Sequence, residues 1–206
     1  MENQMYKSSI SLNDFAEEIQ SELEISPVVS KAAVVRIVNA VEQLLYSEII
    51  NEIRKADVSV SDGRAKLSEI EVSEGEDVVN SYDVIRVFDG RQELGFATPD
   101  DAYVMNETST FGIYDGENIS VCGVDPDRIT VFYKVRPVPK SLELEKICPD
   151  VLHIPDKFIE LFASRIRGEL CKLAGDDGQA TKWLNDYNTF LEDFRIFASK
   201  RAGVDV

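Results

Sequence analysis

Cys148 and His153 are the side chains in this sequence whose types and spacing could support nucleophilic chemistry. His153 is the only histidine of the chain, so a Ser-His-Asp or Cys-His arrangement must use it, and Cys148 precedes it by five residues. A thiolate beside an imidazole would indicate a small hydrolase. The members of such a pair usually come from separate elements, whereas these two share one proline-rich stretch. The preferred interpretation is a histidine at the start of a helix and a small buried cysteine, with no catalytic residue.

Metal ligands and phosphate-binding loops are also weakly represented. Cys122, Cys148 and Cys171 are an odd number of widely spaced cysteines, which argues against a zinc site or a disulfide framework. Four aspartates flank turn residues instead of forming the alternating acidic loop that binds calcium: Asp125, Asp127, Asp176 and Asp177. No glycine-rich loop lies between a strand and a helix. We therefore expect no metal and no cofactor.

Negative charge is concentrated in the middle of the chain. The 206 residues have a formal net charge of −16 at pH 7, and residues 56–150, with 20 acidic and 9 basic residues, contribute −11 of it. Because affinity for DNA comes largely from Lys and Arg that neutralise phosphates, this region should repel duplex DNA. Solubility alone is the simpler explanation of the excess acid, but repulsion would also let DNA pass without sticking.

Aromatic residues in the same region could stack on nucleic-acid bases, as they do on the β-sheets of RNA-binding domains. They are Phe111, Tyr114, Phe132 and Tyr133. Because they lie among acidic residues, core packing or subunit contact is the preferred interpretation. Sequence-specific nucleic-acid binding is not expected.

Signals for membranes and export are not recognisable. No run of about 18 apolar residues occurs, so no membrane-spanning helix is predicted. Residues 1–4 lack the basic start and the apolar stretch of a secretion signal. Free thiols fit a reducing compartment. We expect a cytosolic product with no membrane partner.

Two helices are predicted at the start of the chain. In residues 11–24, Ser11 can cap the helix with Asp14 as its reciprocal partner, and one face is apolar: Leu12, Phe15, Ile19 and Leu23. Residues 30–55 form the longest periodic segment, about seven turns. Its apolar stripe contains Val34, Ile37, Val38, Val41, Leu44, Leu45, Ile49 and Ile53. Glu42 lies on the opposite face and is expected to be solvated.

The middle of the chain has the pattern of short antiparallel strands. Several turn signals separate β-rich runs: Ser61-Asp62-Gly63, Asp89-Gly90, Asp115-Gly116 and Asp125-Pro126-Asp127. Ile129, Val131 and Tyr133 alternate cleanly with other residues, which is typical of a half-buried strand. Residues 68–80 are acidic and predict a strand plus an exposed loop. The region should form four to six antiparallel strands.

The last third returns to helix after an extended connector over residues 136–155, which is marked by four prolines. Pro155 suits a first helical turn. The next helix has an apolar face of Phe158, Leu161, Phe162, Ile166, Leu170 and Leu173, and the last helix has Ala180, Leu184, Tyr187, Leu191, Phe194 and Ala198. The short turn at residues 175–178 makes these two helices an antiparallel hairpin.

These elements predict an α+β fold: a four-helix bundle built from the N- and C-terminal helix pairs, with an inserted small antiparallel β region. We expect one domain over residues 1–206. Its helical bundle would comprise residues 9–55 and 153–200, and the β insertion would comprise residues 56–150.

Several segments resemble, in type and order, the head-to-tail adaptor (connector) proteins of tailed phages. They are VIRVFDG (84–90), ATPDD (97–101), YDGENISV (114–121), ITVFYK (129–134) running into Arg136-Pro137, and IPDKF (154–158) opening a helix hairpin. The resemblance covers residues 30–197. The acidic stretch at residues 68–80 and the tail after Lys200 have no counterpart in it.

The resemblance implies a structural protein of the virion neck, made in the host bacterial cytoplasm. Such adaptors form a homo-oligomeric ring, commonly a dodecamer, beneath the portal protein. The ring extends the DNA channel and offers a platform for downstream tail or neck proteins, and DNA passes through without sequence-specific binding. It implies no enzymatic activity.

Interface candidates lie in the last helix and its tail. Trp183 is off the main apolar stripe, and an exposed indole often anchors an interface, with partial core burial as the alternative. Residues 197–206, which include Phe197, Lys200 and Arg201, are a candidate for portal docking, with a frayed tail as the alternative.

Two other functions stay open. An acidic binding protein directed at the host, such as a nucleic-acid mimic, would be a monomer that binds one host protein tightly and is missing from particles. A small hydrolase would use Cys148 and His153.

Overall fold

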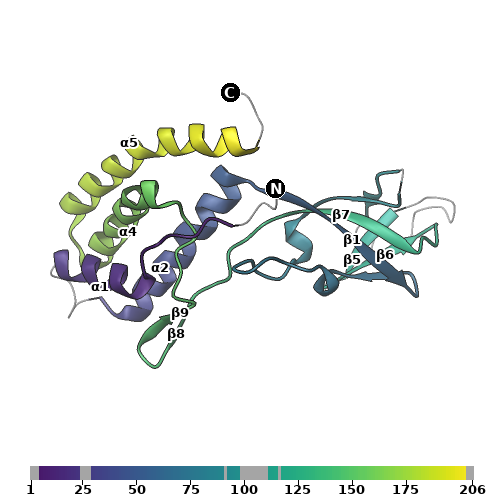
Figure 1. Cartoon of the computed structure of the whole chain (residues 1–206), viewed down its shortest axis with the longest axis horizontal. Coiled ribbons are helices and arrows are strands. Elements are labelled where there is room, and N and C mark those ends of the chain that lie inside the picture. Colours follow the sequence, from purple (N-terminus) through teal and green to yellow (C-terminus); the bar gives the residue numbers. More distant parts are fainter. Residues whose placement is uncertain (1–4, 24–28, 91, 98–110, 116, 203–206) are drawn as a thin grey trace. The chain divides into compact units, whose positions relative to one another are not determined.

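The computed structural model describes residues 5–23, 29–90, 92–97, 111–115 and 117–202 (Figure 1). The chain divides into two compact units. The first, here called the helical unit, combines Met1–Ile50 with Arg136–Val206, and the second, the β unit, is Asn51–Val135. The two ends of the chain therefore belong to one unit, and the middle of the chain forms the other.

The helical unit contains four α-helices and a two-stranded sheet among its described residues. They are α1 (Leu12–Glu22), α2 (Lys31–Leu44), α4 (Ile159–Ala174), α5 (Asp177–Ala202), and the antiparallel pair β8 (Ser141–Glu143) and β9 (Lys146–Cys148). A π-helix, Leu45–Ile50, continues α2, and a 3-10 turn, Asp156–Phe158, precedes α4. The core joins both chain ends, because the Phe15 ring of α1 lies 5.8 Å from the Phe162 ring of α4.

Local sequence explains where these helices begin. The Ser11 hydroxyl accepts a bond from the Asp14 N–H and caps α1, and the Ser30 hydroxyl accepts from the Ala33 N–H and caps α2. The predicted helix of residues 11–24 is confirmed as α1. The predicted hairpin of the last two helices is confirmed as α4 and α5. Gly168 allows these two to pack closely, because a Cβ there would lie 2.8 Å from Leu184 Cγ.

The predicted helix of residues 30–55 is correct only in its first part. α2 buries the expected stripe from Val34 to Val41, but it ends at Leu44 and the chain is extended from Ile53. Ile53, expected on the apolar stripe, is 48% exposed. The reason is tertiary: residues 53–59 pair with a neighbouring strand, which takes up the backbone hydrogen bonds that a helix would have made.

The β unit is built on one seven-stranded sheet. Its strands are β1 (Ile53–Ser61), β2 (Arg64–Lys66), β3 (Val84–Phe88), β4 (Gly95–Phe96), β5 (Phe111–Asp115), β6 (Asn118–Cys122) and β7 (Arg128–Lys134). The order across the sheet is β3-β7-β1-β2-β6-β5-β4, and only β4 and β5 are parallel. Two 3-10 turns, Leu67–Glu69 and Ser81–Asp83, lie in the connections.

The expected fold, a four-helix bundle with a small antiparallel β insertion, is therefore wrong. The structure is an α+β protein with a curled, mixed seven-stranded sheet and four α-helices among the described residues. The predicted β region of four to six antiparallel strands is too small, and it lacks the parallel β4–β5 pair. In the structure, β1 pairs with β7 over seven residues and with β2 at its far end, and β2 pairs with β6, so the hairpins join into one sheet.

Two of the four turn signals are confirmed, because Asp62-Gly63 lies between β1 and β2 and Asp125-Pro126-Asp127 lies between β6 and β7. Asp62-Gly63 forms a two-residue hairpin turn with φ of 52° and 70°. This is the left-handed backbone that glycine tolerates and that aspartate adopts more readily than most residues. Phe88 pairs with Glu93, so the turn that begins at Asp89 spans four residues. Asp115 is the last paired residue of β5 and faces Asn118. Gly116 lies outside the described residues.

The core of the β unit follows the predicted alternation. Ile129, Val131 and Tyr133 of β7 are buried, as expected. The strand predicted within residues 68–80 is absent: this segment is a 3-10 turn followed by irregular chain, with Ile70, Glu76 and Val79 buried.

Candidate interaction surface

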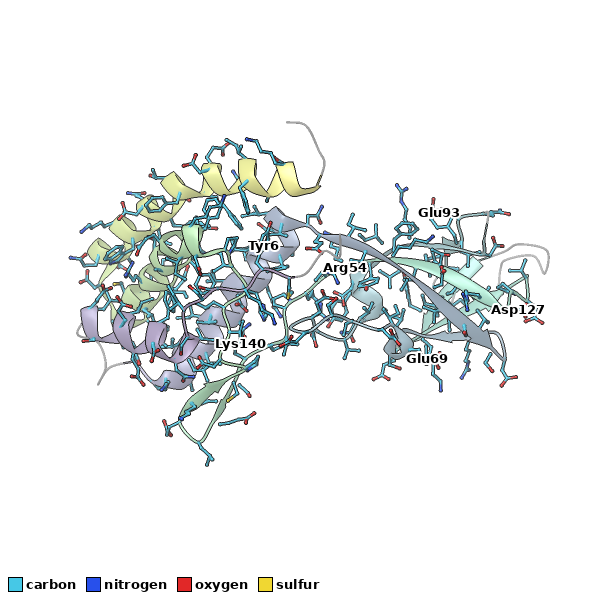
Figure 2. The ribbon with its side chains drawn as sticks, in the orientation of Figure 1. Tyr6, Arg54, Glu69, Glu93, Asp127 and Lys140 are labelled. Atoms are coloured by element: carbon cyan, nitrogen blue, oxygen red, sulfur yellow. The ribbon has the colours of Figure 1, made fainter. Side chains whose placement is uncertain are left out.

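A buried ion pair joins Lys140 of the connector, which is labelled in Figure 2, to Glu42 of α2. Their side chains are 0% and 2% exposed, and Lys140 Nζ donates to Glu42 Oε2. The other oxygen, Oε1, accepts from the backbone N–H of His153 at 2.9 Å. Asn39, one turn earlier in α2, bonds the Lys140 backbone twice, at 2.7 and 2.9 Å. We call Asn39, Glu42, Lys140 and His153 the α2 cluster. The expectation that Glu42 is solvated is wrong.

Burial dominates the electrostatics of the α2 cluster. It raises the pKa of Glu42 and lowers the pKa of Lys140, and in each case the opposite charge and the hydrogen bond between them oppose the effect. Burial also lowers the pKa of His153 to about 4, with the nearby positive charge of Lys140 acting in the same direction. The imidazole is therefore neutral at pH 7.

His153 and Cys148, the sequence-predicted hydrolase pair, lie in the connector. The His153 side chain is buried, and its Nδ1 lies 3.2 Å from the carbonyl oxygen of Tyr6. Because a carbonyl only accepts, the neutral ring holds its proton on Nδ1. Cys148 is half-buried in β9, where its carbonyl accepts from the Ser141 hydroxyl at 3.3 Å. In this arrangement the imidazole ties the connector to the N-terminal residues.

Two aspartates of the connector bind the segment that precedes and opens α1. Asp156 accepts from the Ser8 hydroxyl at 2.6 Å and from the Ser9 N–H and hydroxyl at 2.8 and 2.7 Å, and these bonds lower its pKa. Asp150 accepts from the Ser11 hydroxyl and the Asn13 N–H. Burial raises the pKa of Asp150, but the bonds from Asn13 and Ser11 together lower it further than burial raises it.

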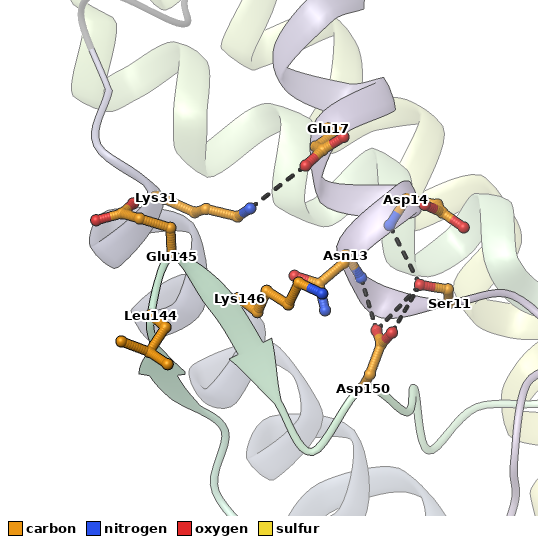
Figure 3. A pocket seen from close by; sticks show the side chains of 9 residues that line it. All are labelled: Ser11, Asn13, Asp14, Glu17, Lys31, Leu144, Glu145, Lys146 and Asp150. Carbon is orange, nitrogen blue, oxygen red and sulfur yellow. Dashed lines mark hydrogen bonds and ion pairs between the residues drawn. The ribbon is translucent and has the colours of Figure 1, made fainter.

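A polar groove of about 600 Å³ lies between the start of α1 and the β8–β9 hairpin (Figure 3). Its walls carry the α1 cap with Asp150, the Lys31–Glu17 ion pair at 3.4 Å, and Leu144, Glu145 and Lys146 of the hairpin. Four carboxylates and two ammonium groups line it, and one of the carboxylates, that of Glu17, is paired with Lys31.

Phe197, an interface candidate from the sequence, packs within the helical unit. Its ring lies 5.8 Å from the ring of Tyr6 and 5.1 Å from that of Phe158. Lys157 Nζ lies 3.6 Å from its centroid, within range of a cation–π contact. Lys200 is exposed on the last turns of α5. The side chains from Arg201 onwards lie outside the description, and so do residues 203–206, the end of the segment proposed to dock on the portal.

Trp183, the other candidate, is half-buried. The Arg167 guanidinium lies 4.8 Å from its ring centroid, and Arg167 also pairs with Glu22 at 2.7 Å and Glu160 at 3.1 Å. Partial burial, the alternative interpretation, describes the indole better than full exposure does.

The tip of the β8–β9 hairpin is a surface feature that the sequence analysis missed. Leu144 is 100% exposed, and Leu144 and Glu145, the two turn residues, have φ of 47° and 65°. The proline-rich surroundings suggested an extended connector. The alternation of Leu142 and Ile147 with charged residues was the signal that could have found the hairpin.

In the β unit, Arg54 (Figure 2) contacts three side chains: Glu52, two residues away in sequence, and the more distant Ser73 and Glu76. Its guanidinium lies 2.8 Å from Glu52 Oε1 and 2.8 Å from the Ser73 hydroxyl, and it also pairs with Glu76. Glu52 and Glu76 are buried, whereas the Arg54 side chain is 17% exposed. We call Glu52, Arg54, Ser73 and Glu76 the β1 cluster. Burial, then the negative charge of Glu76, raises the pKa of the adjacent Tyr133.

The aromatic residues considered for base stacking pack against the sheet's own residues. Tyr114 stacks on Phe96 with 4.2 Å between ring centroids, and Phe132 meets Phe88 edge-on at 5.6 Å. Tyr133 is buried. The Phe111 side chain lies outside the description.

No group of three or more metal-ligating side chains is found in the described part of the chain. None of the helices described here is long and apolar enough to span a membrane. Neither a scan against protein-family models nor a search of curated proteins gives a match.

Proposed function

We propose that this chain is a structural protein of a tailed-phage virion: a head-to-tail adaptor whose copies form a ring beneath the portal. The ring extends the DNA channel and provides a platform for tail or neck proteins. It acts by assembling, and DNA passes through it without sequence-specific contacts.

The observation that carries the proposal is the number of apolar side chains that remain at the surface of both units. The exposed ones are Ile53, Val78, Tyr82, Ile85, Phe96, Val124, Leu144, Leu173, Phe190 and Ile196. Single exposed apolar residues are ordinary, but Tyr82 at 74% and Leu144 at 100% are displayed almost completely. A ring subunit needs contact surfaces for two neighbours and for the proteins above and below it.

Charge supports the same function. Residues 51–135, the β unit, contain 18 acidic and 8 basic residues, a net charge of −10. Phosphates bind to surfaces rich in Lys and Arg, so an acidic wall favours passage of DNA over retention.

Most of the segments that resemble the adaptor family coincide with strands or helices, whereas residues 98–101 of the ATPDD segment lie outside the described residues. Residues 84–88 form β3, residues 114–115 and 118–121 belong to β5 and β6, and residues 129–134 belong to β7. Residues 154–158 open the α4–α5 hairpin.

The test is to mix the purified chain with the portal protein encoded by the same genome and to image the product by electron microscopy. We expect a closed ring of this chain on one end of the portal, with an open axial channel. The portal alone and the chain alone are the controls. A chain that never associates with the portal and is missing from purified particles would overturn the proposal and favour the host-directed binding protein.

A further inference from the structure

The β8–β9 hairpin presents one apolar side chain to solvent on a fixed base. Ile147 of β9 is buried, and its backbone N–H and carbonyl bond the Asn13 side chain at 2.8 and 3.0 Å. The tip comprises Glu143, Leu144 and Glu145, and here it is called the hairpin tip. Because its base is held by α1, the hairpin tip projects as a preformed knob.

The residues of this turn are poorly suited to its backbone. Both turn residues have positive φ, a conformation that favours Asn-Gly or Asp-Gly in two-residue hairpins. The β1–β2 hairpin has the same geometry and uses Asp62-Gly63. Leu144 and Glu145 are disfavoured there, and the leucine gains no burial in compensation. A strained turn that displays a leucine is an outlier that points to a role outside this copy of the chain.

The opposite side of the helical unit holds a surface of complementary character. Figure 1 shows the hairpin at the lower side of this unit and the last turns of α5, in yellow, along its upper side. There Ile196 is 42% exposed and Lys200 follows one turn later. Phe197, with Lys157 over its ring, adjoins them. We call Lys157, Ile196, Phe197 and Lys200 the α5 patch.

Charge favours a contact between these two surfaces. The hairpin tip places an acidic residue on each side of its leucine, whereas the α5 patch has two lysines and two apolar side chains. Two acidic residues precede the patch by one turn, and one of them, Glu192, is paired with Arg195 at 3.6 Å.

We infer that the hairpin tip of one copy of this chain docks on the α5 patch of the next copy, with Leu144 against Ile196 and the glutamates near the lysines. The inference rests on the proposed ring. Two different surfaces on opposite sides of one unit make a head-to-tail contact, which closes into a ring when the rotation allows it. Both surfaces belong to the helical unit, so the contact does not depend on the placement of the β unit.

The test is disulfide cross-linking in the full chain assembled with its portal protein. The double variant Leu144→Cys/Ile196→Cys is expected to give a ladder of linked copies on a non-reducing gel, because every copy carries both halves of the contact. An equimolar mixture of the two single variants should stop at dimers. The native chain and Leu144→Cys/Leu173→Cys are the controls and should give no ladder.

Charge reversal gives an independent readout. Glu143→Lys/Glu145→Lys and Lys157→Glu/Lys200→Glu each place like charges across the contact, and each is expected to reduce ladder formation about tenfold or more. Combining the two reversals should restore it. All four positions are exposed. Because Lys157→Glu removes the contact with the Phe197 ring, thermal unfolding of each variant is the control for the fold.

The outcomes separate this contact from the proposed function. A ring that forms on the portal without a ladder, or Leu144→Cys chains that link to one another, would overturn the contact and leave the adaptor function standing. Cross-links from Ile196→Cys to the portal protein would overturn it as well. If the native chain forms no ring, both the contact and the proposed function fail.

Discussion

The helical unit and the β unit each bury charged side chains, but they compensate them differently. In the α2 cluster one ammonium faces one carboxylate, and both are at most 2% exposed. In the β1 cluster one guanidinium serves two buried carboxylates and is itself 17% exposed. The first cluster is closed to water and depends wholly on its partners, whereas water can help to screen the second. The two units should therefore respond to the loss of a charge with different severity.

The largest effect is expected from Lys140→Met, which leaves Glu42 buried without its counter-charge. We expect the helical unit to lose about 3–5 kcal/mol of unfolding free energy. Urea unfolding followed by the fluorescence of Trp183, the only tryptophan, measures it. Adding Glu42→Gln removes the orphaned charge and keeps an acceptor for the His153 N–H. A double variant no more stable than Lys140→Met alone would contradict this account of the α2 cluster.

Acid should weaken the α2 cluster through His153. Its pKa is about 4 in the folded chain, against 6.5 as its ordinary value. Between pH 6.5 and 4 the imidazole is protonated in the unfolded chain and neutral in the folded chain. The contribution of His153 to the free energy of unfolding is therefore complete above pH 6.5 and decreases as the pH falls towards 4. The total loss is about 3 kcal/mol.

The matched variant for this pH effect is His153→Asn, whose amide can still donate to the Tyr6 carbonyl. It should show a shallower loss of stability between pH 6.5 and 4 in urea titrations at a series of pH values. Carboxylates such as Asp156 titrate in both proteins and cancel in the difference. Equal pH slopes for the native chain and the variant would refute the assignment to His153.

In the β unit, Arg54→Met should have a smaller effect, about 2 kcal/mol, because the guanidinium it removes is part-exposed. Amide hydrogen exchange should locate the loss of protection in β1 and β7. Arg54→Lys keeps the charge without the planar fork and should recover part of it. If Arg54→Met loses as much unfolding free energy as Lys140→Met, the proposed difference between the two clusters is wrong.

The smallest effects should come from the two hairpin turns, and they should have opposite signs. Gly63→Ala in the β unit places a Cβ at φ +70° and should destabilise by about 1 kcal/mol. Leu144→Asn/Glu145→Gly in the helical unit supplies residues suited to its turn and should stabilise by about 0.5–1 kcal/mol. Thermal unfolding of both variants measures this. Destabilisation by the second variant would show that Leu144 serves its own fold.

Elements with a strong local signal could be predicted from the sequence. The cap at Ser11, the stripe of α2, the alternation of β7 and the α4–α5 hairpin all follow from residue spacing. The end of α2 could not be predicted from residue spacing, because Ile49 and Ile53 continue the helical period. Residue 53 is extended because it pairs with β7. For the same reason the size of the sheet was underestimated: strand partners come from distant segments.

The α2 cluster and the β1 cluster could not be predicted from the sequence, for a related reason. Glu42 stands on the polar side of its helix, and nothing nearby in sequence shows that Lys140, far along the chain, will cover it. Arg54 and Glu76 are likewise joined only by the fold. The β8–β9 hairpin was not predicted because its proline-rich surroundings are typical of an extended chain. Its apolar and charged residues nevertheless alternate as they do in a strand.

The central proposal is that the chain functions by assembling into a ring on the portal. It is tested most directly by measuring the mass of the assembly. Native mass spectrometry of the complex with the portal protein should give one discrete mass with a fixed number of copies of this chain, twelve by analogy with the adaptor family. A spectrum that contains only separate portal and single 23.1 kDa chains would contradict it.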